Sequence, residues 1–165
     1  MTAVAEHSAA AWIARSLKAR GVTRVFALCG GHVMPIWMRL DAEGIAIVDV
    51  RDERAAVYMA HAHAELTGGL GVALVTAGPG VTNAMTGIAN AHVARASVLV
   101  LSGVPPRPQE NRGALQDMDF FIGFFPISIS PAIQSIILIF HLMCCSSLLY
   151  LSAKRGVSLA ASACD

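Results

Sequence analysis

The sequence has 165 residues, enough for one domain with a sizeable core. Its formal net charge is only +1, from 12 basic and 11 acidic residues. The chain therefore offers no wide field of one sign to nucleic acid or to an anionic membrane, and we expect no nucleic-acid partner. The four cysteines lack CxxC spacing, which argues against a zinc site. Their usage favours a reducing compartment. The N-terminus lacks the pattern of a secretory or transit peptide, so we expect a cytoplasmic location.

Strand-like and helix-like segments alternate along the first two thirds of the chain. Apolar residues recur at helical spacing in residues 10–21 and end at Gly21, and a short apolar run follows at residues 24–28. The same alternation then repeats. The further expected helices are residues 33–44, 53–68 and 81–95, and the further expected strands are residues 45–50, 71–77 and 98–103.

The expected strands are continuous apolar runs, which is typical of a parallel sheet covered by helices on both faces. In such sheets ligands bind beyond the carboxyl ends of the strands, because several loops meet there. The loops that qualify are residues 29–32, 51–53 and 77–80 and the one that starts at Gly103. We therefore look for a site among these four loops.

The composition changes at Phe120, because residues 120–153 contain no Asp, Glu, Lys or Arg. Within this tail, residues 135–151 form a 17-residue apolar stretch, near the lower limit for a membrane-spanning helix. Three interpretations remain open: an alternative or out-of-frame end of the chain, a membrane anchor, or a buried segment. We divide the chain into a domain at residues 1–119 and an apolar tail of uncertain structure at residues 120–165.

Glu53 stands at the head of an apolar helical stripe that continues with Ala56, Val57 and Ala60. This spacing turns the carboxylate toward the protein. A simple explanation is that Asp52 caps the helix and Glu53 complements its positive end, which is favourable by roughly 0.3 to 1 kcal/mol. The neighbouring loops favour a functional role instead.

Gly78, Pro79 and Gly80 follow a strand and precede a helix that we expect to begin at Val81, so backbone amides there can approach a ligand closely. A tight turn with no ligand is the alternative. As a dinucleotide-binding fingerprint the stretch is weak, because Asn83 stands where GxGxxG needs glycine.

Two other motifs carry weaker hypotheses. The sequence "CGGH", residues 29–32, could expose a cysteine nucleophile, but no acidic orienting partner is apparent, so a glycine loop that leaves room for a ligand is favoured. The sequence "HAHAE", residues 61–65, places His61 and Glu65 on one helical face. It lacks the HExxH order of a zinc site, and we expect no metal ligands in this chain.

Residues 9–119 resemble the N-terminal pyrimidine-binding domain of thiamine-diphosphate enzymes of the acetolactate synthase type. The resemblance implies a flavodoxin-like, doubly wound parallel α/β sheet, here incomplete at its C-terminal end. "GGH" with "RGALQ" is closer to the acetolactate-synthase-like and 2-hydroxyacyl-CoA lyase branch than to the biosynthetic synthases. The stretches that carry the resemblance are "GVTRVFALCGGHVMPIW", "VDVRDERAAVYMAHAHAELTG", "GVALVTAGPGVTNAMTGIANA", "VLVLSG" and "ENRGALQDMD".

The resemblance implies a thiamine diphosphate cofactor and a role for each loop. Glu53 would hydrogen-bond N1′ of the aminopyrimidine, which favours the imino form whose nitrogen removes the C2 proton of the thiazolium. Gln116 would reach the substrate side. Gly78, Pro79, Gly80 and Asn83 would line the wall of the pyrimidine site, and Gly30, Gly31 and His32 would form the lip of the cleft.

Two departures from the family pattern matter. Cys29 stands where many members have proline. The sequence also has no GDG motif, so the magnesium ion and its diphosphate anchor would come from a domain that this chain lacks, as would the FAD that some full-length relatives carry. We therefore expect negligible catalysis by the chain alone.

The implied activity of the family is formation or cleavage of carbon–carbon bonds on 2-keto or 2-hydroxy acyl substrates. The implied partner is a second copy or a full-length relative, bound through the pyrimidine-domain interface. Two alternatives stay open: a non-catalytic interaction module that pairs with a full-length relative, or a fragment tethered to a membrane by residues 135–151.

Overall fold

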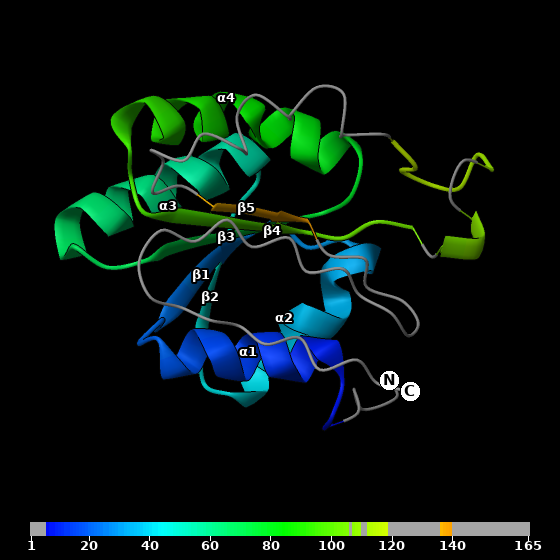
Figure 1. Ribbon diagram of the computed structural model, residues 1–165, viewed down its shortest axis with the longest axis horizontal. Coiled ribbons are helices and arrows are strands. Elements are labelled where there is room, and N and C mark those ends of the chain that lie inside the picture. The colour runs from blue at the N-terminus through cyan, green and yellow to red at the C-terminus, as the bar shows by residue number, and fades with distance from the viewer. Residues whose placement is uncertain (1–5, 106, 110–111, 119–135, 140–165) are drawn as a thin grey trace.

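The structure, a computed structural model, describes residues 6–105, 107–109, 112–118 and 136–139. Helices and strands alternate through most of this part of the chain (Figure 1). The elements are α1 Ala9–Ala19, β1 Arg24–Ala27, η1 Gly31–Val33, α2 Met34–Ala42, β2 Ala46–Asp49, α3 Glu53–Thr67, β3 Gly71–Val75, α4 Pro79–Ala94, β4 Val98–Ser102, η2 Arg107–Gln109 and β5 Ile136–Ile139.

The strands form one parallel sheet in the order β2-β1-β3-β4-β5. This is the flavodoxin-like strand order, and the chain reverses its winding direction between β1 and β3. The expected fold class is therefore confirmed. The loops that follow β1 and β3 leave the sheet at this switch point, where such folds bind their ligands.

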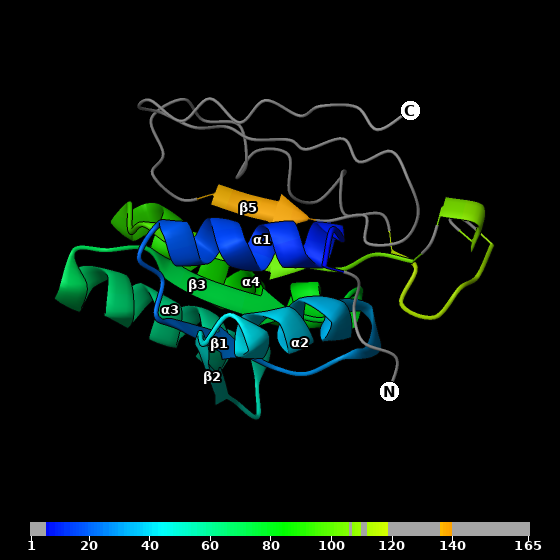
Figure 2. The same cartoon turned by 90° about the horizontal axis from the view of Figure 1, so that it is seen from below.

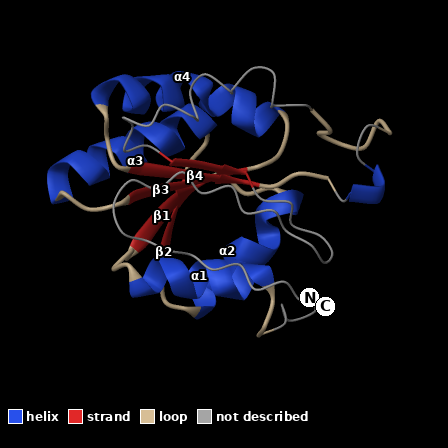
Figure 3. Cartoon of the chain, in the orientation of Figure 1, coloured by secondary structure: helices blue, strands red, loops and turns tan. Residues whose placement is uncertain are grey.

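The sheet lies between two layers of helices, with α1 and α2 on one face and α3 and α4 on the other (Figures 1 and 3). Each layer has its own apolar core against the sheet, because each helix turns one apolar stripe inward. Ile13, Leu17, Ile36 and Leu40 belong to the first core, and Val57, Ala60, Val81, Ala84 and Ile88 belong to the second.

The caps of two helices explain why they begin and end where the sequence indicates. Ser8 caps α1 by accepting a hydrogen bond from the backbone amide of Ala11. Asp52 caps α3 in the same way, and Gly68 ends that helix in the left-handed conformation that glycine adopts without strain. Helix α4 begins at Pro79, two residues earlier than expected, because proline at the first helical position needs no amide partner.

The fifth strand comes from the apolar tail, where the sequence analysis assigned no structure. Residues Ile136–Ile139 pair in parallel with β4, with Leu99 opposite Ile136. This strand is the orange arrow labelled β5 in Figure 2. The remainder of the 135–151 stretch lies outside the described residues. Within the described part of the chain, no helix has both the length and the apolar character needed to cross a bilayer.

Candidate functional site

The loops at the carboxyl ends of four strands touch one another, as expected for this fold. Gly30, after β1, is in contact with the side chain of Thr76, after β3. A Cβ on Gly80 would lie 3.4 Å from Glu53 Oε1, and a Cβ on Gly103 would lie 2.6 Å from the Cβ of His32. These loops therefore lie in contact with one another beside the switch point of the sheet.

Glu53 is nearly buried, with 7% of its surface exposed. It begins α3, and the stripe that it heads, Ala56, Val57 and Ala60, is fully buried, as predicted. Asn83 Nδ2 donates a hydrogen bond to Glu53 Oε2 at 3.1 Å. Oε1 receives no hydrogen bond from the described residues. Oε1 is not one of the fully buried, unpaired polar atoms of the described residues, so it can accept a hydrogen bond from a ligand or from water.

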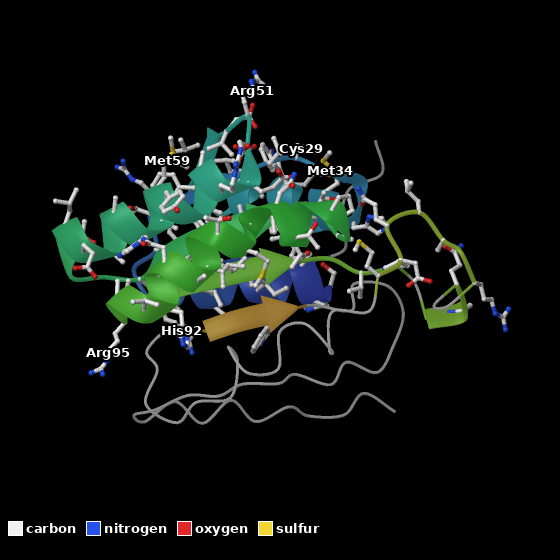
Figure 4. All side chains as sticks on the ribbon, turned by 90° about the horizontal axis from the view of Figure 1, so that it is seen from above. Cys29, Met34, Arg51, Met59, His92 and Arg95 are labelled. Atoms are coloured by element: carbon white, nitrogen blue, oxygen red, sulfur yellow. The ribbon has the colours of Figure 1, made fainter. Side chains whose placement is uncertain are left out.

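The charged neighbours of Glu53 all face solvent. Asp52 Oδ1 accepts a hydrogen bond from the backbone amide of Arg54 at 2.8 Å, and the Arg54 guanidinium contacts both Asp52 oxygens. The hydrogen bond from the Arg54 side chain is the main reason that the pKa of Asp52 falls to about 2. Arg51 points away from the body of the protein, with its side chain 92% exposed (Figure 4). Asp52 therefore caps the helix, and the Glu53 carboxylate takes no part in the cap.

The Gly78–Gly80 turn needs glycine for two different reasons. Gly78 has φ 60° and ψ −117°, a backbone conformation that residues with a Cβ rarely adopt. Gly80 lies in the first turn of α4, where a Cβ would come within 2.8 Å of Thr76 Cγ2. The absence of a side chain on Gly80 lets the start of α4 pack directly against Thr76 and Glu53.

Gln116 folds back over this turn from a later segment of the chain. A Cβ on Gly78 would lie 2.8 Å from the backbone oxygen of Gln116. Gln116 Oε1 lies 3.0 Å from His32 Nδ1 and 3.3 Å from the hydroxyl of Thr76. The structure therefore brings the two residues that were assigned to the lip and the substrate side, His32 and Gln116, into direct contact.

Thr76 is the residue of this site that the sequence analysis missed. Its side chain contacts Gly30, Gly80 and Gln116, and the residue is 9% exposed. Ser102 ends β4 in a similar way and donates a hydrogen bond to the backbone oxygen of Thr76 at 3.0 Å. A hydroxyl residue directly after an apolar strand was the available signal, because such a buried group needs a partner.

The weaker hypotheses gain no geometric support. Cys29 is an exposed free cysteine. His61 Nε2 lies 4.0 Å from Glu65 Oε1, and the other ring nitrogen of His61 contacts Asn90. His63 packs its ring against Phe26 instead, as its different helical direction implies. Among the residues that the structure places, no three His, Cys, Asp or Glu side chains gather as a metal site would require.

The candidate site suits an aminopyrimidine ring. Such a ring offers a nitrogen that can share a proton with a carboxylate, and Glu53 Oε1 is an acceptor with no other partner among the described residues. Gly80 has no side chain and lies next to this oxygen, since a Cβ there would be 3.4 Å from it. A carboxylate oxygen that can accept a hydrogen bond, held beside a residue without a side chain, therefore fits the pyrimidine part of thiamine diphosphate.

Comparison with known proteins agrees with the geometry. Residues 7–122 match the family described as "Thiamine pyrophosphate enzyme, N-terminal TPP binding domain". The chain is 46% identical over 115 residues to 2-hydroxyacyl-CoA lyase 2 of Caenorhabditis elegans and 44% identical over 115 residues to 2-hydroxyacyl-CoA lyase 2 of Homo sapiens, with 70% of this chain and 18% of each relative covered. It is 41% identical over 107 residues to the acetolactate synthase large subunit IlvG of Mycobacterium tuberculosis, with 65% of this chain and 20% of that relative covered.

These relatives are much longer than the chain, which spans about a fifth of their length. The match lies in the part that contains Glu53, the Gly78–Gly80 turn and Gln116. Thiamine pyrophosphate and thiamine diphosphate are two names for one cofactor. The chain therefore belongs to the thiamine pyrophosphate enzyme family, and its matched part is the N-terminal TPP binding domain of that family.

Proposed function

We propose that this chain binds the aminopyrimidine of thiamine diphosphate through Glu53. The observation that carries the proposal is Oε1 of Glu53, a residue only 7% exposed: this oxygen accepts no hydrogen bond from the described residues and lies beside Gly80. Asn83 fixes the other oxygen, so the carboxylate is oriented before any ligand arrives. Such preorganisation lowers the entropy cost of binding.

The residues around the proposed site have different roles in binding. Glu53 Oε1 would share a proton with the ring nitrogen N1′ of the cofactor. Gly78, Pro79 and Gly80 line the ring face with backbone, while Gly30 and Gly31 lie at the lip and Gln116 faces the substrate. When bound, the cofactor supplies an electron sink for the carbanion that forms on a 2-keto or 2-hydroxy acyl substrate.

A binding experiment on the full chain tests this assignment. Thiamine diphosphate is titrated into isotopically labelled protein, and backbone amide shifts are followed by NMR. We expect the largest shifts at Glu53, Gly78 and Gly80. The variant Glu53→Gln should bind roughly tenfold or more weakly, because a hydrogen bond to a charged group contributes about 1.5 to 3 kcal/mol.

Glu65→Gln is the matched control, because Glu65 lies on the same helix but is exposed. It should bind thiamine diphosphate as the unchanged chain does. Equal affinity of the Glu53→Gln variant and the unchanged chain, or shifts spread over the exposed face of α3, would contradict the proposal.

The reaction of the complete enzyme is a further part of the proposal. By similarity to relatives named 2-hydroxyacyl-CoA lyase 2 and acetolactate synthase, we assign carbon–carbon bond formation or cleavage on 2-keto or 2-hydroxy acyl substrates. The magnesium ion that holds the diphosphate would come from outside this chain, and FAD would be confined to full-length relatives. The cytoplasmic location also stays a prediction.

We further propose that a second copy or a full-length relative binds this domain. The solvent face of α3 supports an interface, because Tyr58, Met59 and Leu66 lie on it with 42%, 43% and 86% of their surfaces exposed. Size-exclusion chromatography with light scattering should show a dimer or larger assembly that the double variant Met59→Lys and Leu66→Lys weakens. A monomer at all concentrations would contradict this part.

A further inference from the structure

Thr76 and Gln116 offer an inference that goes beyond cofactor binding. Three side chains from different loops meet at one atom, Gln116 Oε1, which lies 3.3 Å from Thr76 Oγ1 and 3.0 Å from His32 Nδ1. An amide group has one oxygen that accepts and one NH2 that donates. Its orientation therefore decides whether Thr76 and His32 donate hydrogen bonds to it or accept them from it.

The hydroxyl of Thr76 decides between the two orientations. Thr76 is 9% exposed, and among the described residues Gln116 Oε1 is the acceptor that its hydroxyl reaches. If the Gln116 amide were rotated by half a turn, its NH2 would face Thr76. The Thr76 hydroxyl proton would then have no acceptor among the described residues. A buried donor without a partner costs about 1 to 3 kcal/mol, so the orientation with Oε1 toward Thr76 is favoured.

The orientation of the amide then fixes the proton on His32. Oε1 can only accept, so His32 Nδ1 must carry the hydrogen that lies between the two residues. In the neutral ring this leaves Nε2 unprotonated. A free histidine side chain prefers the opposite tautomer, with the proton on Nε2, so the cluster must impose this state.

The backbone shows that Gln116 is held in place. Gln116 has φ 63°, in the left-handed region that residues other than glycine rarely occupy, at a cost of about 1 to 3 kcal/mol. Its backbone also fills the space that a Cβ on Gly78 would need. The two contacts to Oε1 help to offset that cost, which explains why a strained residue stays in this position.

We propose that Thr76 is a positioning residue that orients the Gln116 amide and thereby sets the Nδ1-protonated tautomer of His32. The consequence for the site is specific. It gains an unprotonated Nε2 on His32 and, on Gln116, an amide NH2 that no described residue binds. Their use on a substrate rests on the proposed thiamine function. The tautomer itself is a property of the chain without cofactor, so it is measured separately.

Nitrogen NMR of the full chain, recorded without cofactor, tests the proposal. Long-range proton–nitrogen correlation distinguishes a protonated from an unprotonated ring nitrogen at a pH where the His32 ring is neutral. The unchanged chain should show a protonated Nδ1 and an unprotonated Nε2. Thr76→Val replaces the hydroxyl by a methyl group and should shift His32 toward the Nε2-protonated form, while Thr76→Ser should retain the original tautomer.

Two further variants separate positioning from a general structural effect. Thr86→Val makes the same chemical change at an exposed site on α4 and should leave His32 unchanged. Adding Gln116→Glu to Thr76→Val should restore a protonated Nδ1, because a carboxylate accepts with both oxygens and has no donating end. A destabilised fold alone would not produce this rescue.

The outcomes are decisive in both directions. Loss of the Nδ1 proton in Thr76→Val, with rescue by Gln116→Glu, supports the proposal. An Nε2-protonated His32 in the unchanged chain, or the same tautomer in the unchanged chain and in Thr76→Val, would overturn it. A chain that shows the expected tautomers but no thiamine diphosphate binding would contradict the proposed function and leave this inference standing.

Discussion

At the scale of single residues, close packing around Thr76 explains which glycines are needed. Gly30 and Gly31 are neighbours in the sequence, but only Gly30 is pressed against Thr76, while a Cβ on Gly31 would meet nothing within 4 Å. The "CGGH" loop was interpreted as room for a ligand. The structure shows that Thr76 fills the space beside Gly30, so the space beside Gly31 is the part left for other groups.

This difference gives the first prediction. Gly30→Ala should lower the free energy of unfolding by about 1 to 3 kcal/mol, because the added methyl group overlaps the side chain of Thr76 and forces a shift. Gly31→Ala should change it by less than about 0.5 kcal/mol. Urea denaturation followed by circular dichroism measures both. Equal costs for the two variants would show that Thr76 does not pack against Gly30.

The second prediction concerns the loss of folding stability at low pH. The pKa of Asp52 is lowered from 3.8 to about 2, chiefly by the hydrogen bond from Arg54, so the folded state favours the charged carboxylate. The stabilisation is present above pH 3.8 and is lost as the pH falls toward about 2. Asp52→Asn keeps the cap but cannot ionise, and should remove this part of the pH dependence of stability. A carboxyl titration by NMR with an ordinary midpoint would contradict it.

The sequence predicted some of these residues and not others, for a physical reason. Glu53 stood out because a charged group headed an apolar stripe, and its burial followed from local spacing. Asp52 was predictable as a cap in the same way. The contact of Thr76 with Gln116 joins residues 40 positions apart, and the contact of His32 with Gln116 joins residues 84 positions apart. No local sequence pattern predicts contacts between residues so far apart in the chain.

At the scale of elements, the helix ends show where local sequence and structure disagree. Both α3 and α4 end in the left-handed conformation, with Gly68 at φ 66° and Arg95 at φ 58°. Glycine adopts this conformation without strain, whereas arginine does not. The existence and order of α1 to α4 and β1 to β4 were predictable from apolar periodicity, but the start of α4 was misplaced by two residues, because Pro79 is part of the helix.

The third prediction follows from these ends. Arg95→Gly should raise the free energy of unfolding by about 0.5 to 1 kcal/mol, because it relieves the backbone strain at the end of α4. Gly68→Ala should lower it by about 1 kcal/mol for the converse reason. Thermal denaturation of both variants measures the effects. Stabilisation by Gly68→Ala would contradict the assigned backbone conformation.

At the scale of the whole molecule, the sheet continues into a segment that composition alone could not interpret. The tail contains no Asp, Glu, Lys or Arg in residues 120–153 and does not continue the alternation of strand-like and helix-like segments that precedes it, so the sequence left its structure open. The structure pairs β5 in parallel with β4 and so covers what would be an exposed edge. The pairing satisfies the backbone groups along that side of β4 and moves the edge of the described sheet to β5.

The fourth prediction tests that pairing. Hydrogen exchange measured by mass spectrometry should show slowed exchange for the peptide that contains Ile136–Ile139, because half of its amides lie toward β4. Val98–Ser102 should be strongly protected, since β4 is paired on both sides. Exchange of residues 136–139 at the rate of an unstructured peptide would show that β4 is the edge of the sheet.

The central claim, that Glu53 recognises N1′ of the cofactor, is tested most directly by removing each partner in turn. Affinities of the unchanged chain and of Glu53→Gln are measured for thiamine diphosphate and for its analogue with carbon in place of N1′. We predict that the unchanged chain prefers the natural cofactor by roughly tenfold and that Glu53→Gln shows no preference, so that the two changes are not additive. Additive losses, or the same preference in both proteins, would contradict the claim.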